Sequence, residues 1–190
     1  NLLNTLIQEN IQSYTVPHVL LKKQDEFVES ESRYTLYSGG VGSGKTLSGI
    51  YRAIFLSIKY PNNVGLIGSQ TEMQLETTTM FSFEEIVNSF DKKIIVKWTK
   101  SNNRIELFNG SIIFYRSLDD ESKLRSLNLG WFYIDEATTI HKSVWDMLTS
   151  RLRLSRVEKQ FGFITTNPDT YYHWVYKEFI ENERDDYKTI

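Results

Sequence analysis

The stretch that decides the fold is Ser38-Gly39-Gly40-Val41-Gly42-Ser43-Gly44-Lys45-Thr46, residues 38–46. The apolar segment 33–39 leads into it and predicts a short buried strand. After it, apolar residues recur at helical spacing over residues 47–58, and the pattern stops before Pro61, where the preceding residue disfavours the α conformation. A strand, a glycine-rich loop and an amphipathic helix in this order are typical of a loop whose backbone amides cradle a phosphate.

The residue types of this loop fit the chemistry of a triphosphate. Glycines allow positive φ, so successive N–H groups can wrap an anion. Lys45 supplies a cation to the β and γ phosphates, and the Thr46 hydroxyl is a hard oxygen ligand for Mg²⁺. The residues expected to contact the nucleotide are Gly39, Gly40, Val41, Gly42, Ser43, Gly44, Lys45 and Thr46.

A second motif is the apolar run 131–134 followed by Asp135 and Glu136. Such a run is typical of a parallel strand buried on both faces, and ligands of open α/β sheets gather at the carboxyl ends of strands. Asp135 is therefore expected beside the loop as a holder of Mg²⁺, with Glu136 polarising the attacking water. The chain has no Asn-Lys-x-Asp base-reading motif, so the acid pair favours an ATPase over a GTPase switch.

The remaining pattern alternates strands and helices. Strands are expected at 33–39, 64–69, 94–98, 129–135 and 161–166, and helices at 46–60, 72–90, 143–153 and 170–181. Residues 104–117 read as a hairpin, for which Asn109-Gly110 predicts a two-residue primed turn. The fold class that follows is α/β, a P-loop NTPase of the ASCE type, with a mainly parallel central sheet, helices on both faces and an antiparallel hairpin insertion.

Composition narrows the class of protein. The chain has 190 residues and a formal charge of −2, with 40% apolar and 14% aromatic residues, so we expect one ordered domain rather than a disordered or strongly basic chain. It has no cysteine and three distant histidines, which argues against disulfides and a zinc or haem site. No apolar run approaches the roughly 18 residues of a membrane span, so a soluble intracellular domain without membrane contact is expected.

These motifs together resemble the ATPase domain of the large terminase subunit, the motor that packages DNA into tailed-phage capsids. The resemblance covers about residues 18–181. It rests on the loop at 39–46, on Asp135-Glu136-Ala137, on the hairpin at 109–110, and above all on the tail Thr-Asn-Pro-x-x-x-x-His-Trp-Val-Tyr-x-x-Phe at 166–179.

The resemblance implies further site residues. Gln24, in an N-terminal adenine-side segment over residues 1–32, resembles the glutamine that reads the adenine edge, although an exposed helical glutamine is the open alternative. Thr165, Thr166 and Asn167 resemble the coupling motif that senses the γ-phosphate, or else cap a strand. Arg125 resembles an arginine finger given to a neighbouring subunit, or else is a surface arginine.

The sequence also departs from the family. Many relatives carry an arginine in the loop where this chain has Val41, which raises the expectation that Arg125 acts in trans. The family has a C-terminal nuclease domain, which is not expected in this chain: residues 1–190 are expected to form a single ATPase domain. Two basic clusters could contact DNA, although a solvated face is the simpler reading for both: Lys92, Lys93, Lys97 and Lys100, and Arg151, Arg153 and Arg156.

The partners that the resemblance implies are double-stranded DNA, the portal protein, the small terminase subunit and further copies of the chain in a ring on the portal. The expected location is the host cytoplasm, transiently at the procapsid portal. Two alternatives stay open: a helicase-like, nucleic-acid-dependent ATPase, and a binding module that holds nucleotide without hydrolysing it.

Overall fold

A computed structural model describes residues 20–90, 93–182 and 184–190 of the chain. The strands in this part are β1 (Tyr34–Ser38), β2 (Val64–Ser69), β3 (Ile95–Thr99), β4 (Arg104–Leu107), β5 (Ile112–Ser117), β6 (Trp131–Ile134), β7 (Phe161–Thr166) and β8 (Tyr187–Thr189). They form one eight-stranded sheet of order β3-β4-β5-β2-β6-β7-β1-β8. In the part of the sheet with the order β5-β2-β6-β7-β1-β8, all neighbouring strands pair in parallel. Strand β4 pairs antiparallel with both β3 and β5.

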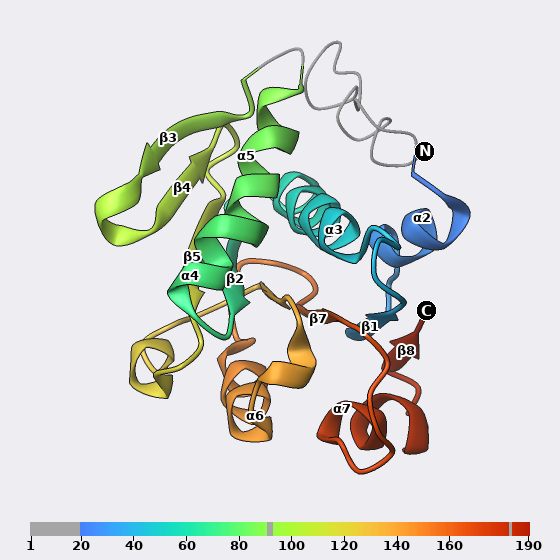
Figure 1. The fold of residues 1–190 in the computed structure, drawn as a ribbon. Helices are drawn as coiled ribbons and strands as arrows, with labels where there is room; N and C mark the ends of the chain where they lie inside the picture. The colour runs from blue at the N-terminus through green and yellow to red at the C-terminus, as the bar shows by residue number, and fades with distance from the viewer. Residues whose placement is uncertain (1–19, 91–92, 183) are drawn as a thin grey trace.

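The helices cover both faces of this sheet. They are α2 (Lys22–Val28), α3 (Lys45–Lys59), α4 (Glu72–Gln74), α5 (Phe81–Asn88), α6 (Lys142–Arg151) and α7 (Trp174–Tyr176), with π-helical turns η1 (Leu75–Met80) and η5 (Lys177–Glu181) and 3₁₀ turns η2 (Lys100–Asn102), η3 (Glu121–Leu124) and η4 (Ala137–Thr139). In Figure 1, α3 and α5 lie on one side of the sheet, and α6 and α7 lie on the other. The predicted fold class is confirmed.

Each face of the sheet has its own apolar core. One core joins α2, α3 and α5 to the sheet, and the other joins α6, α7 and η5 to it. The alternation of side chains in β6 explains why both cores are needed: Trp131 and Tyr133 belong to the first core, and Phe132 and Ile134 belong to the second. None of the helices in the described part of the chain is both long and apolar enough to cross a bilayer.

The close approach of α3 to the sheet depends on a small residue. A Cβ added at Gly49 would lie 2.1 Å from the Tyr133 ring, so only glycine lets the helix lie this close to β6. The helix begins at Lys45, directly after Gly44, and ends at Lys59, before Pro61. It therefore starts at the phosphate loop as the sequence predicts.

The prediction for the hairpin turn is wrong in its type. A type I′ turn requires positive φ at both central residues. Gly110 has φ 79°, but Asn109 does not have a positive φ. The Leu107 N–H donates to the Ser111 carbonyl at 2.8 Å, and the Gly110 N–H donates to the Leu107 carbonyl at 3.1 Å. This is a three-residue loop ending in a left-handed glycine, and the Asn109 amide instead caps the end of α3 by donating to the Ser57 carbonyl at 2.8 Å.

Two further expectations need correction, and one strand was missed. The single helix expected over 72–90 is α4, η1 and α5, with the π turn η1 in its middle. The helix expected over 170–181 begins only at Trp174, because residues 170–173 form a turn. The edge strand β8 was not predicted, since it is short and its alternation is weak.

Candidate nucleotide site

The phosphate loop connects β1 to α3 and has the backbone conformation that its glycines predict. Gly42 has φ 78° and Gly44 has φ 76°, both in the left-handed region. The Lys45 side chain is 7% exposed, and its ammonium donates to the Gly40 carbonyl at 2.7 Å. The Lys45 side chain thus lies against the loop that precedes it, at the N-terminus of a 15-residue helix.

Asp135 lies directly beside this loop, as predicted. Its backbone N–H donates to the Gly68 carbonyl at 2.9 Å, which continues the β2–β6 pairing by one step. The Thr46 hydroxyl lies 3.1 Å from Asp135 Oδ2 and 3.3 Å from Oδ1. Residues 89 positions apart in the sequence therefore bring a hydroxyl and a carboxylate together at the carboxyl edge of the sheet.

Glu136 follows Asp135 in a conformation that few non-glycine residues adopt. Its φ of 53° and ψ of 52° are left-handed, which costs of order 1 kcal/mol or more and is typical of functional positions. The carboxyl is partly buried: desolvation and then the charge of Asp135 raise its pKa, and Lys45 opposes this. Glu136 is thus close enough to Lys45 of the phosphate loop to be affected by its charge.

The residues at the end of β7 that the resemblance assigns to coupling lie between the loop and the acid pair. β7 is the strand between β1 and β6. The Gly39 N–H donates to the Thr166 carbonyl at 3.2 Å, and the Thr166 hydroxyl lies 2.8 Å from that of Thr138 in η4. Asn167 Oδ1 is buried and has no hydrogen-bond partner among the described residues. These residues thus connect the loop to the segment that follows Glu136.

Gln24 also reaches the phosphate loop. Its side chain is 5% exposed, its Nε2 donates to the Ser43 carbonyl at 3.2 Å, and its Oε1 accepts from the Leu21 N–H at 2.8 Å. A Cβ at Gly44 would lie 2.3 Å from the Gln24 amide. The expected segment 1–32 is described only from residue 20 onward, and the rest lies outside the described residues.

Arg125 is the predicted site residue that the fold does not bring to the loop. It is exposed at the end of η3, and its carbonyl accepts from Arg151 Nη1 at 2.8 Å. Within the described residues, its guanidinium makes no hydrogen bond to the loop or to Asp135. An exposed position is what an arginine offered to a neighbouring molecule requires.

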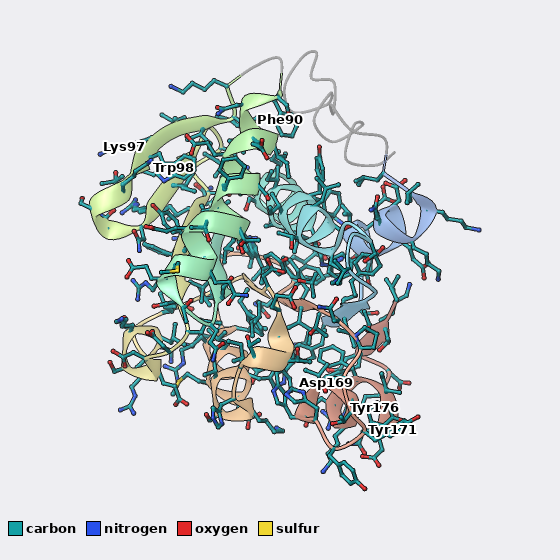
Figure 2. All side chains as sticks on the ribbon, in the orientation of Figure 1. Phe90, Lys97, Trp98, Asp169, Tyr171 and Tyr176 are labelled. Atoms are coloured by element: carbon teal, nitrogen blue, oxygen red, sulfur yellow. The ribbon has the colours of Figure 1, made fainter. Side chains whose placement is uncertain are left out.

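The described residues of the first basic cluster lie in and beside strand β3. Figure 2 shows Lys97 at the β3 edge of the sheet, on the opposite side of the view from Asp169 and Tyr171 near α7. Lys92 of the first cluster lies outside the described residues. In the second cluster, Arg151 and Arg156 bond backbone carbonyls, so they also support the fold.

The residues at the loop fit a magnesium nucleotide. Ser43 Oγ is buried and has no hydrogen-bond partner in the described part of the chain, so a polar atom in the loop is left for a ligand. Thr46 and Asp135 supply hard oxygens. No group of three or more His, Cys, Asp or Glu side chains that could hold a metal ion by themselves occurs among the described residues. Proteins usually hold Mg²⁺ through one or two carboxylates together with substrate phosphates.

Two residues of the site were not found from the sequence. Thr79 Oγ1 lies 2.9 Å from Asp135 Oδ2, and Tyr133 OH lies 2.9 Å from Thr165 Oγ1, which in turn lies 2.7 Å from Asp135 Oδ1. The only sequence signal for Thr79 was the run Thr77-Thr78-Thr79. Three threonines in a row weaken a helix, so their presence in a helical segment suggests a role other than helix formation.

The strand order, the phosphate loop and the Asp135–Thr46 contact together define a P-loop NTPase. The phage terminase large subunit family matches residues 31–190, and the chain belongs to this family.

Individual relatives agree with this assignment. The chain is 25% identical over 162 residues to the PBSX phage terminase large subunit of Bacillus subtilis (strain 168), covering 85% of this chain and 37% of that protein. Two solved structures share its fold. The large terminase of a thermophilic bacteriophage in complex with ADP has a TM-score of 0.76 at 15% identity, covering 89% of this chain and 44% of that one. The large terminase ATPase domain of Thermus phage P74-26 has a TM-score of 0.71 at 19% identity, covering 92% of this chain and 81% of that one. The chain thus spans just over a third of the curated relative.

Proposed function

We propose that this chain is the ATP-hydrolysing motor domain of a viral terminase, which drives translocation of double-stranded DNA into a procapsid with Mg²⁺ and ATP. The observation that carries the proposal is the contact of Thr46 with Asp135 beside the phosphate loop, with Glu136 next in sequence. The structurally similar terminase solved with ADP supports the choice of ligand. Family membership favours packaging over the helicase-like alternative.

Each residue has a role that follows from its position. Lys45 leaves the Gly40 carbonyl to neutralise the β and γ phosphates, while loop N–H groups hold them. Thr46 and Asp135 hold Mg²⁺, which when bound neutralises charge on the phosphates. Glu136 accepts a proton from the attacking water, and its raised pKa makes it a better base than an exposed carboxylate.

Two further parts of the site respond to the nucleotide, one to its γ-phosphate and one to its adenine base. Thr166 and Asn167, between the loop and η4, respond to the γ-phosphate and pass its loss to the rest of the motor. Gln24 reads the adenine edge after its amide exchanges partners, because an amide can donate to and accept from adenine together.

The wider assembly is part of the same proposal. Copies of the chain form a ring on the portal protein in the host cytoplasm, and the small terminase subunit works with them on double-stranded DNA. Arg125 then reaches the nucleotide of a neighbouring subunit, where its planar charge stabilises the transition state. Grip on DNA through phosphates gives little sequence selectivity.

Glu136→Ala tests the hydrolytic step. The variant is expected to bind ATP while its steady-state ATPase rate falls by about 100-fold or more, since the general base is lost. Glu158→Ala, an exposed carboxylate far along the chain, serves as the matched control. A Glu136→Ala turnover equal to the wild type would refute the assignment.

Arg125 is tested by mixing variants. Neither Arg125→Ala nor Lys45→Ala assemblies are expected to hydrolyse ATP efficiently, but mixed assemblies regain part of the rate because one chain supplies the arginine and the other the loop. An unchanged ATPase rate of assembled Arg125→Ala would show that the arginine is only a surface residue.

A further inference from the structure

We infer that Thr79 is a positioning residue for the Asp135 carboxylate, and through it for the magnesium edge of the nucleotide site. The inference rests on the proposed function. Thr79 is 0% exposed and lies in the π turn η1, on the long helical segment 72–88 rather than on the loop or the strands. Its hydroxyl reaches Asp135 Oδ2 at 2.9 Å.

The direction of each hydrogen bond follows from counting protons. An ionised carboxylate only accepts, so the single hydroxyl proton of Thr79 goes to Asp135. Ser69 Oγ lies 3.2 Å from Thr79 Oγ1 and must therefore be the donor to it. Ser69, at the end of β2, is also 0% exposed. The chain Ser69 to Thr79 to Asp135 thus fixes the rotation of the Thr79 hydroxyl.

Asp135 is held by hydroxyls from three separate elements. Thr46 comes from the start of α3, Thr165 from β7 and Thr79 from η1. A carboxylate offers about four acceptor positions, so three donors leave about one for a metal-bound water. Thr79 reaches Oδ2 and Thr165 reaches Oδ1, so without Thr79 the Oδ2 atom keeps only Thr46 as a hydroxyl donor among the described residues.

Thr79 faces Asp135 from the buried side of the π turn η1. In the segment 75–80, the apolar residues Leu75 and Met80 are buried, whereas Thr77 and Thr78 are exposed. The i to i+5 bonding of a π turn keeps Met80 on the packed face together with Leu75 while Thr79 is buried beside them. Such turns occur frequently at functional sites. Leu75, Thr79 and Met80 thus share the buried face of η1, and Thr79 supplies the polar contact with the site.

The test uses the full 190-residue chain and three threonine variants. Thr79→Val removes the hydroxyl at nearly constant shape, and Thr79→Ser keeps the hydroxyl. Thr78→Val is the matched control, because it makes the same change one residue away on the exposed surface. Two quantities are measured with a fluorescent ATP analogue: its affinity in EDTA, and the Mg²⁺ concentration that gives half of the metal-dependent gain in affinity.

The expected result separates metal from nucleotide. Thr79→Val raises the half-saturating Mg²⁺ concentration roughly tenfold, the scale of one hydrogen bond to a charged group, and leaves affinity in EDTA unchanged. Thr79→Ser and Thr78→Val behave like the wild type. Ser69→Ala, which frees the Thr79 hydroxyl without removing it, shifts the Mg²⁺ midpoint in the same direction by a smaller factor.

Other results would overturn the inference. An unchanged Mg²⁺ midpoint in both Thr79→Val and Ser69→Ala would show that Thr79 does not position Asp135. An equal loss of affinity in EDTA would show a general structural role instead. A wild-type chain that gains no affinity from Mg²⁺ would refute the proposed function itself, which is a different failure.

Discussion

Two buried ionisable side chains of this molecule differ in the kind of hydrogen-bond partner that surrounds them. Asp135, 3% exposed, is surrounded by the hydroxyls of Thr46, Thr79 and Thr165, which we call the Asp135 cluster. Arg52, 0% exposed, lies against backbone carbonyls at the end of α2, which we call the Arg52 cluster. Neither charge has an oppositely charged side chain in contact among the described residues.

The Arg52 cluster joins α3 to α2. The guanidinium donates to the carbonyls of Phe27, Val28 at 3.2 Å and Ser30 at 2.9 Å. It also lies 5.1 Å from the centre of the Phe163 ring, a cation–π distance. Burial lowers the pKa of Arg52 to about 9, so the side chain still carries its charge at neutral pH.

The difference lies in whether the partners can exchange. Carbonyls are fixed to the backbone, so Arg52 can lose them only when α2 moves. Hydroxyls rotate about one bond, so Thr46 can turn a lone pair to a metal while the carboxylate stays in place. The Asp135 cluster is therefore suited to binding and release, and the Arg52 cluster to permanent support.

Arg52→Met is expected to have the largest effect on stability. It leaves up to three buried carbonyls without a donor, each costing about 1–3 kcal/mol, partly offset because the arginine no longer has to be desolvated. We expect the free energy of unfolding to fall by about 3 kcal/mol, measured by urea denaturation. Arg52→Lys keeps the charge but lacks the planar guanidinium, so its free energy of unfolding should lie between those of the wild type and Arg52→Met. A stability within 0.5 kcal/mol of the wild type, on the scale of a surface substitution, would mean that the Arg52 cluster does not support the fold.

Gln24→Ala tests the connection between the two regions, because Gln24 lies on α2, the helix that Arg52 holds, and contacts the phosphate loop. The variant is expected to bind ATP about fivefold more weakly, the scale of one neutral hydrogen bond near 1 kcal/mol, whether that bond goes to the adenine or to the Ser43 carbonyl. Competition by GTP distinguishes two roles. A glutamine that reads adenine loses ATP-over-GTP preference when removed, whereas one that only supports the loop weakens both nucleotides equally.

Glu31→Gln should have the smallest effect. Burial opposes ionisation of Glu31, but hydrogen bonds from Lys59 and Lys159 outweigh it and lower its pKa below the ordinary value. A lowered pKa in the folded state gives stability that is present above pH about 4.5 and lost as the pH falls through the lowered value. We expect about 0.5 kcal/mol at pH 7, as for surface ion pairs, and no difference from wild type in strong acid. A difference that persists in acid would rule out this electrostatic origin.

The sequence predicted the parts of the site that are local. The loop at 38–46 and Asp135-Glu136 are short motifs, and alternation of strands and helices was enough to place them on one edge of a parallel sheet. It could not predict Thr79, because three adjacent threonines do not reveal which of them contacts a carboxylate 56 positions away. Nor could it predict Arg52, since a lone arginine on an apolar helix face carries no signal of its carbonyl partners.

The most direct test of the contrast is the effect of Mg²⁺ on stability with saturating ATP. A ligand at 100 times its Kd stabilises by about 2.7 kcal/mol. Our account predicts that adding Mg²⁺ to ATP raises the melting temperature of the wild type and of Arg52→Met, whose baseline is lower, but not of Asp135→Asn. An equal rise in Asp135→Asn would contradict the claim that the Asp135 cluster is the metal edge of a nucleotide site.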